Sequence, residues 1–444
     1  MFALFRDDMP HAERLCQEML QDFPVTDPYL RGNLYTCLIY AQREMFNFNS
    51  VNTFDAQSLQ LYEEANSRFV LIWHYSILGP TELERGNLDQ AEASLTLARA
   101  IASEISGELS PLAAMPGILL AEIFYERNQL EKADDLLNLY LPIADQIGFV
   151  DQLIAGYIYR ARLLVARGAD TEAKKLLKEA KTLAVKRDFR RFEIHAEAEN
   201  ARQMILTRDY KMARHLFREM LKQTNPDSLY PGTRVISSDA IKALTWCRLA
   251  IVEGHLNDAA AVSRKWIRFA KNRNALRTAM QFNVLLAHIL QQSGDARKSM
   301  RALREALVAA MSTGFVRTIT DEMKNNISLL TQFVQGQHLA DDPILNYANQ
   351  LLKIIADECG QDIPASSVSV DSFVVEDLPV ELLSEREREI LQLVAGGLLN
   401  KEIAESLCTT EGSVKWYLQL IYDKLGTRRR AQAVQRARDN GFIR

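Results

Sequence analysis

The chain has 444 residues, of which 48% are apolar and 25% charged, and its formal net charge is −4. This length predicts two or three domains rather than one small core. The five cysteines are widely spaced and form no Cys-x-x-Cys pair, which argues for a reducing compartment and against structural zinc. No apolar run approaches the roughly 18 residues that span a bilayer, and no signal-peptide layout is present, so we expect a soluble, cytoplasmic protein without membrane contact.

A long internal repeat fills the middle of the chain. Turn-plus-helix segments recur at steps of 42, 40, 40, 46 and 40 residues, beginning at Gly86, Asn128, Gly168, Arg208, Gly254 and Gly294. The fifth residue after each start is small: Ala91, Ala133, Ala173, Ala213, Ala259 and Ser299. The seventh residue before each start is also small: Gly79, Ala121, Ala161, Ala201, Cys247 and Ala287. Small residues at two fixed places permit close helix contact, so the pattern predicts antiparallel helical hairpins stacked into a solenoid.

These hairpins resemble tetratricopeptide-type repeats, although their period is longer than the usual length of about 34 residues. Two earlier helical pairs, at 10–41 and 55–70, are expected to begin the array, and a helix at 343–356 to cap it. The predicted solenoid covers residues 1–357. Residues 358–381 contain proline, serines and acidic residues without helical periodicity, and are predicted to be a flexible linker.

The resemblance to tetratricopeptide-type hairpins implies which residues face the concave side of the solenoid. These residues follow the small residue of each first helix and are Pro80, Glu122, Arg162, Arg202, Arg248 and His288. Three successive arginines and a histidine in line suit a carboxylate, a phosphate or an acidic peptide, so Arg162, Arg202, Arg248 and His288 are the predicted groove for a ligand or partner. The alternative is that each arginine pairs with a carboxylate of its own hairpin.

The last part of the chain, residues 382–444, has helix starts and turns in the order of a helix-turn-helix domain. Ser384 and Glu387 have capping-box spacing at the start of a predicted helix at 385–395. Gly396 and Gly397 permit a turn, after which Asn400 is expected to cap a short second helix.

The recognition helix is predicted to cover 411–425, with Thr410 as its N-cap. Its apolar residues recur at helical spacing: Val414, Leu418, Ile421 and Leu425. A fourth helix at about 429–440 presents Ala433, Val434 and Ala437 to the same small core. The predicted fold class is therefore all-α, a helical-hairpin solenoid followed by a four-helix domain.

Basic and polar residues gather on the outer side of the recognition helix and after it. Residues 411–444 contain eight Lys or Arg against three Asp or Glu, hence +5, although the whole chain is negative. Double-stranded DNA is the partner that this charge and helix arrangement predict. The candidate DNA-binding residues are Thr410, Ser413, Lys415, Trp416, Gln419, Lys424, Arg428, Arg429 and Arg430.

These residues resemble the LuxR-type helix-turn-helix family. The matching text is LSERE at 383–387, NKEIA at 400–404, SVK at 413–415 and IYDKLG at 421–426. The resemblance implies a four-helix domain, DNA contacts from Lys415, Trp416 and Gln419, and dimer pairing on DNA through the fourth helix at Val434 and Ala437. Tyr417 stands where the family usually has His, and Leu420 where it often has Asn, which puts affinity and target sequence in doubt.

A long-period solenoid followed by such a domain looks like the C-terminal part of the MalT-like transcription activators. Their N-terminal nucleotide-binding module has no counterpart here, because no G-x-x-x-x-G-K-[ST] occurs; the chain either never had the module or is a fragment. We expect a transcription regulator whose solenoid senses an inducer or a regulatory protein. The alternative is a helical-repeat adaptor whose terminal helices contact protein.

Catalytic chemistry has little support in the residues. His195 and Glu197 form an H-x-E, but the P-C-x-x-C half of the zinc-deaminase signature is absent. No Gly-x-Ser-x-Gly occurs and the seven histidines do not cluster. We therefore expect no enzyme, no metal and no cofactor.

Overall fold

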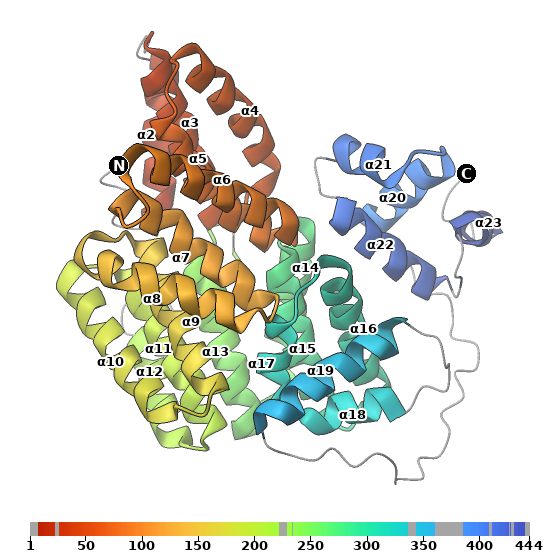
Figure 1. Cartoon of the computed structure of the whole chain (residues 1–444). Coiled ribbons are helices and arrows are strands. Elements are labelled where there is room, and N and C mark those ends of the chain that lie inside the picture. The colour runs from red at the N-terminus through yellow and green to blue at the C-terminus, as the bar shows by residue number, and fades with distance from the viewer. Residues whose placement is uncertain are drawn as a thin grey trace.

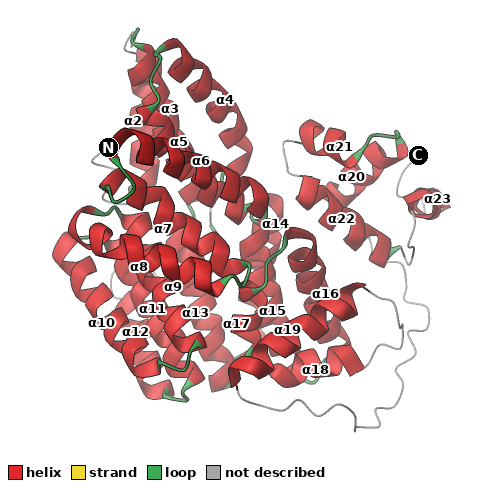
Figure 2. Cartoon of the chain, viewed as in Figure 1, coloured by secondary structure: helices red, strands yellow, loops and turns green. Residues whose placement is uncertain are grey.

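A computed structural model of the chain describes residues 8–22, 26–221, 229–232, 234–335, 343–359, 385–407, 411–425, 427 and 430–439. The regular secondary structure of these residues is helical throughout and includes no strand (Figure 2). None of the described helices is both long and apolar enough to cross a membrane. The all-α prediction is confirmed.

Most of the chain forms a curved array of paired helices (Figure 1). The array consists of α2 (Met9–Asp22), α3 (Pro28–Glu44), α4 (Phe48–Glu64), α5 (Phe69–Glu84), α6 (Leu88–Ser106), α7 (Pro111–Glu126), α8 (Leu130–Ile147), α9 (Val150–Ala166), α10 (Asp170–Arg187), α11 (Arg190–Leu206), α12 (Tyr210–Leu221), α13 (Ser237–Glu253), α14 (Leu256–Asn272), α15 (Leu276–Gln292), α16 (Ala296–Thr313), α17 (Arg317–Met323), α18 (Ile327–Gln335) and α19 (Pro343–Cys359). The C-terminal helices are α20 (Glu385–Ala395), α21 (Asn400–Ser406), α22 (Glu411–Lys424) and α23 (Arg430–Asp439).

The six repeat starts read from the sequence are turns between paired helices. Each start has a positive φ, with values from 60° at Asn128 to 84° at Gly86, and the second helix of the hairpin begins two residues later. A left-handed backbone is cheapest for glycine, which occupies four of the six starts. The predicted hairpins α5/α6, α7/α8, α9/α10, α11/α12, α13/α14 and α15/α16 are confirmed.

The small residues of the repeat lie where the two helices of a hairpin touch. At both positions the side chains are buried in all repeats. A Cβ atom added at Gly79 on α5 would lie 2.5 Å from the side chain of Leu95 on α6. Real Cβ contacts are longer, so only a residue without a side chain permits this approach of α5 to α6.

One hairpin of the array, α3/α4, is not predicted by the small-residue pattern. Its turn residue Phe46 has φ of 58° and lies 40 residues before Gly86, in register with the repeat. Its inner positions hold the larger Ile39 and Val51, so the small-residue signature is missing. The predicted pair at 10–41 is present as α2 and α3, which pack together, although α3 packs more extensively against α4. The predicted pair at 55–70 is wrong, because these residues cover the end of α4 and the start of α5.

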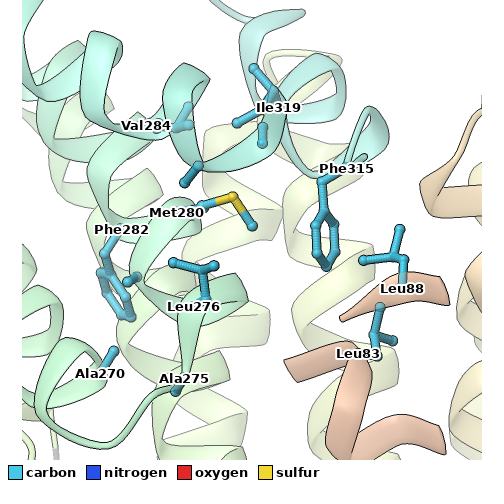
Figure 3. Close-up of a cluster of buried hydrophobic side chains, with 14 of the residues drawn as sticks. Leu83, Leu88, Ala270, Ala275, Leu276, Met280, Phe282, Val284, Phe315 and Ile319 are labelled. Atoms are coloured by element: carbon cyan, nitrogen blue, oxygen red, sulfur yellow. The ribbon is translucent and has the colours of Figure 1, made fainter. Parts of the chain in front are cut away.

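The solenoid curls so tightly that helices from distant repeats meet on its inner side. On α15, the backbone N–H of Thr278 donates to Glu84 of α5 at 3.0 Å. The backbone N–H of Val316, just before α17, donates to the carbonyl oxygen of Glu126 on α7 at 2.8 Å. In the buried cluster of Figure 3, Phe315 lies next to Leu83 and Leu88 from the end of α5 and the start of α6.

Helix α17 therefore packs within the curve of the array, against α7, α15 and α19. The helix predicted to cap the array is present as α19 and ends at Cys359. Nearly all of the predicted linker, residues 360–381, lies outside the described residues.

Candidate nucleic-acid interface

The four C-terminal helices enclose a small apolar core. From α20, Ile390, Leu391 and Val394 are buried; Val414, Leu418 and Ile421 of α22 are buried against them. The residues Ile403, Ala404, Leu425, Ala433 and Ala437 complete this set. The predicted first helix and recognition helix have their expected bounds to within one residue, and their apolar faces are confirmed.

The start of α21 differs from the prediction. Asn400 is the first residue of the helix rather than its cap, and the N-cap position is held by Leu399. The exposed backbone N–H of Leu399 donates to the Glu402 carboxylate at 2.6 Å. The Glu402 side chain therefore supplies one half of a capping box, and Leu399 cannot supply the other half because its side chain has no oxygen. Gly397 supplies the predicted positive φ, at 88°.

Lys415 is the described residue that best represents the predicted DNA-facing side of α22. Its side chain is 55% exposed and pairs with Glu411, one turn earlier, at 2.9 Å. An exposed pair of this kind adds little stability and exchanges easily for a phosphate partner. The residues Thr410, Arg428 and Arg429, and the side chains of Ser413, Trp416, Gln419 and Lys424, lie outside what the structure describes.

Arg430, predicted to belong to a basic rim, is bonded within the domain. Its guanidinium donates to the side-chain oxygen of Asn400 at 3.3 Å and also to the carbonyl oxygens of Leu398 and Val394. These bonds tie the start of α23 to α20 and to the turn before α21. No residue pattern predicts this structural role, since a basic residue beside Arg428 and Arg429 fits a phosphate contact equally well.

The predicted pairing surface on α23 is smaller than expected. Ala437 is fully buried in the core of its own domain, so its methyl group is not available to a partner. Val434 packs against the same core but stays partly exposed. A pairing surface on α23 therefore depends on Val434.

The inner arginines of the solenoid lie against carboxylates of the chain itself. Arg162 donates to Glu199 at 2.9 Å and Arg202 pairs with the same carboxylate at 2.6 Å, so Glu199 joins α9 to α11. Arg248 donates to Glu322 of α17, with 3.1 Å between its Nε and the Oε2 atom. The predicted row of arginines lies on the inner side of the array. Helix α17 supplies partners to Arg202 and Arg248 that no repeat position predicts.

His288 lies close enough to Glu322 for this carboxylate to raise its pKa, but burial has the larger effect and lowers the pKa of His288 from 6.5 to about 4. Its Nε2 is 3.1 Å from the side-chain amide nitrogen of Gln292, one turn later on α15.

Burial and the neighbouring arginines have opposite effects on the pKa values of the inner carboxylates Glu199 and Asp321. Burial raises the pKa of Asp321 on α17, but Arg202 and Arg317 outweigh it and lower the pKa to about 2. Glu199 follows the same logic, since burial opposes its charged form and Arg162 and Arg202 hold its pKa below the usual value. The inner face is thus a set of neutralised ion pairs at physiological pH.

Two models of known protein families match this chain. The family model of the MalT-like TPR region matches residues 1–336. The chain belongs to the MalT-like TPR family. In this MalT-like chain, residues 381–437 also match the model of bacterial regulatory proteins of the luxR family. The predicted pairing of a tetratricopeptide-type solenoid with a LuxR-type domain is confirmed.

Relatives of this MalT-like chain include transcription regulators. The HTH-type transcriptional regulator AlkS of Ectopseudomonas oleovorans is 20% identical over 438 residues, covering 99% of this chain and 47% of AlkS. The regulator MalT of Yersinia enterocolitica is 28% identical over 197 residues, covering 43% of this chain and 22% of MalT. The chain therefore spans about half the length of AlkS. A solved Rap protein complexed with competence and sporulation factor is 14% identical, covers 62% of this chain and 75% of its own, and has a TM-score of 0.48.

Proposed function

We propose that this MalT-like chain regulates transcription by binding promoter DNA with α22 as the recognition helix. The observation that carries the proposal is that one side of α22 is buried in the domain core and the other is exposed. Val414 and Ile421 are fully buried in the domain core, whereas Lys415 on the same helix is exposed. A helix held in this way can place its outer side chains in a major groove. The luxR-family match and the regulators among its relatives support the same function.

The direct test is selection of genomic fragments by the full chain, followed by fluorescence anisotropy on the enriched sequence. We expect saturable binding that weakens steeply as salt rises, because phosphate contacts release counterions. A chain that retains no DNA at low salt and instead captures protein would support the adaptor alternative.

We also propose that the domain pairs on DNA through α23. Val434→Glu would place a charge on the partly exposed part of this helix, while Gln432→Glu changes an exposed neighbour. We expect the first variant to lose cooperative binding to two adjacent half-sites and the second to keep it. Unchanged helix content by circular dichroism would separate lost pairing from lost folding, and cooperative binding by Val434→Glu would exclude this surface.

The solenoid is proposed to sense an inducer or a regulatory protein. An anionic ligand at the inner row would have to displace a carboxylate already present, and Glu322 at Arg248 lies on the short helix α17 rather than on a repeat. We expect such a ligand to raise the melting temperature of the full chain. Arg202 pairs with Glu199 of its own helix, whereas Arg248 pairs across to α17, so the inner row is best probed at Arg248.

A further inference from the structure

The solenoid and the helix-turn-helix domain share a groove of about 380 Å³. Its floor includes the apolar side chains of Ile267 and Leu286, on α14 and α15. Five basic side chains of the solenoid line it: Arg264, Arg268, Lys271, Lys298 and Arg301. The helix-turn-helix domain contributes Glu387 of α20 and Tyr417 of α22. In Figure 1, these C-terminal helices lie beside the α14–α16 end of the array.

Tyr417 joins the two parts of the chain by a direct hydrogen bond. Its hydroxyl donates to the backbone carbonyl oxygen of Lys271, in the last turn of α14, at 2.9 Å. The side chain is only 4% exposed although it belongs to the helix proposed to read DNA. A hydroxyl at this level of burial needs a partner, and here the partner belongs to the solenoid.

Glu387 makes the contact electrostatically complementary. It is 3% exposed and lies in a groove whose solenoid side carries five basic residues and the single carboxylate of Glu305. A carboxylate buried to this extent is stable only among positive charges or hydrogen-bond donors. The groove thus matches Glu387 in charge and matches Tyr417 in hydrogen bonding.

We expect this contact and a complex with DNA to exclude each other. Helix α22 packs against α16 along the same contact. An α-helix with its side chains is about 10–12 Å across and the major groove is about 12 Å wide, so a recognition helix in the groove can be covered only on its back. Helices α20 and α21 of the same domain already pack on α22, so α16, as a further neighbour, would lie where a wall of the groove has to pass. We propose that the α14–α16 face is a docking surface for the chain's own helix-turn-helix domain, and that docking withholds α22 from DNA. The second half of this proposal rests on the proposed function.

Charge reversal on the solenoid side tests the proposal without altering α22. Arg268 and Arg301 are exposed groove residues, so Arg268→Glu with Arg301→Glu would repel Glu387 while sparing the solenoid core. The matched control is Arg218→Glu with Arg297→Glu, which reverses two exposed arginines that do not line the groove. Both double variants lower the net charge by the same amount.

The first measurement is small-angle X-ray scattering of the full chain without DNA. We expect a larger radius of gyration and maximum dimension for the groove variant than for the wild type, and no change for the control. A groove variant as compact as the control overturns the docking surface. Circular dichroism establishes that both variants keep their helix content.

The second measurement is fluorescence anisotropy with a short random-sequence double-stranded DNA. Added negative charge by itself weakens DNA binding, so tighter binding by the groove variant cannot come from net charge. If about nine-tenths of the wild type is docked, release raises the apparent affinity about tenfold. If the groove variant has the larger radius of gyration but binds DNA no better than the control, docking does not keep α22 from DNA. If scattering shows a larger radius of gyration for the groove variant but no variant binds DNA, the docking surface is retained and the proposed DNA-binding function is overturned.

Discussion

Ser299 Oγ donates a hydrogen bond of 2.6 Å to the backbone carbonyl oxygen of Ala287. These residues hold the two small positions of the last repeat, on α16 and α15, and both are fully buried. In the preceding repeat, the Sγ atom of Cys247 lies 3.9 Å from the backbone carbonyl oxygen of Ala259. The two small positions of a hairpin therefore face each other, and a larger side chain at either would push the helices apart.

Overpacking at this contact should destabilise the solenoid. We expect Ala287→Leu to lower the free energy of unfolding by about 1–3 kcal/mol, because added methylenes in a filled core force the neighbouring side chains to move. Ala296→Leu is the matched control, since Ala296 is exposed at the start of α16. Urea denaturation followed by circular dichroism gives both values. Equal midpoints for the two variants would show that the α15/α16 contact tolerates a larger residue.

The shared carboxylate of Glu199 should matter far more than a surface ion pair. Glu199→Gln leaves the buried Arg202 and the partly buried Arg162 without their common negative partner, and breaking such a network costs about 3–5 kcal/mol. The control is Glu104→Gln, which breaks a pair with Arg68 of similar length, 2.7 Å, whose side chains are 61% and 63% exposed. We expect a change below about 1 kcal/mol there. Similar losses in both variants would mean that the inner face is hydrated in solution.

His195 should make the solenoid less stable in mild acid. Burial, and next Arg191, lower the pKa of His195 from 6.5 to about 4. Between these values the unfolded chain binds a proton that the folded chain does not, so stability is fully present above pH 6.5 and falls as the pH is lowered towards 4. From pH 8 to pH 5 this residue should contribute a loss of about 2 kcal/mol.

Unfolding free energies at pH 8 and pH 5 test this pH dependence. The loss of unfolding free energy between these pH values should be about 2 kcal/mol smaller in His195→Gln than in the wild type. It should be unchanged in His255→Gln, whose imidazole is 62% exposed. A wild type and His195→Gln that lose equal stability between the two pH values would place the pKa of His195 near its ordinary value.

The repeat could be read from the sequence because its signal is local. Small residues at fixed spacing identify hairpins whose contact is repeated, and the turn at Gly254 with Cys247 and Ala259 follows this rule. The hairpin α3/α4 was missed because Ile39 and Val51 fill the same contact with larger side chains.

Contacts between distant repeats could not be read in this way. The bond from Val316 to Glu126 and the pairing of Arg248 with Glu322 depend on how strongly the array curls. Curvature accumulates from small rotations at every hairpin, and no residue pattern records the sum. The burial of Tyr417 against α14 also had no signal beyond its departure from the LuxR pattern, because it depends on contact between two domains whose sequence patterns are independent.

DNA binding by α22 depends on the side chains of its exposed side, so Lys415→Ala is the decisive variant. Lys353→Ala on α19 is the control, because both lysines are exposed and only Lys415 lies on the proposed recognition helix. Fluorescence anisotropy on the selected genomic sequence, at one fixed salt concentration, should show a loss of about 1–3 kcal/mol in binding for Lys415→Ala and none for Lys353→Ala. Wild-type affinity of Lys415→Ala for that sequence would contradict the assignment of α22 as the recognition helix.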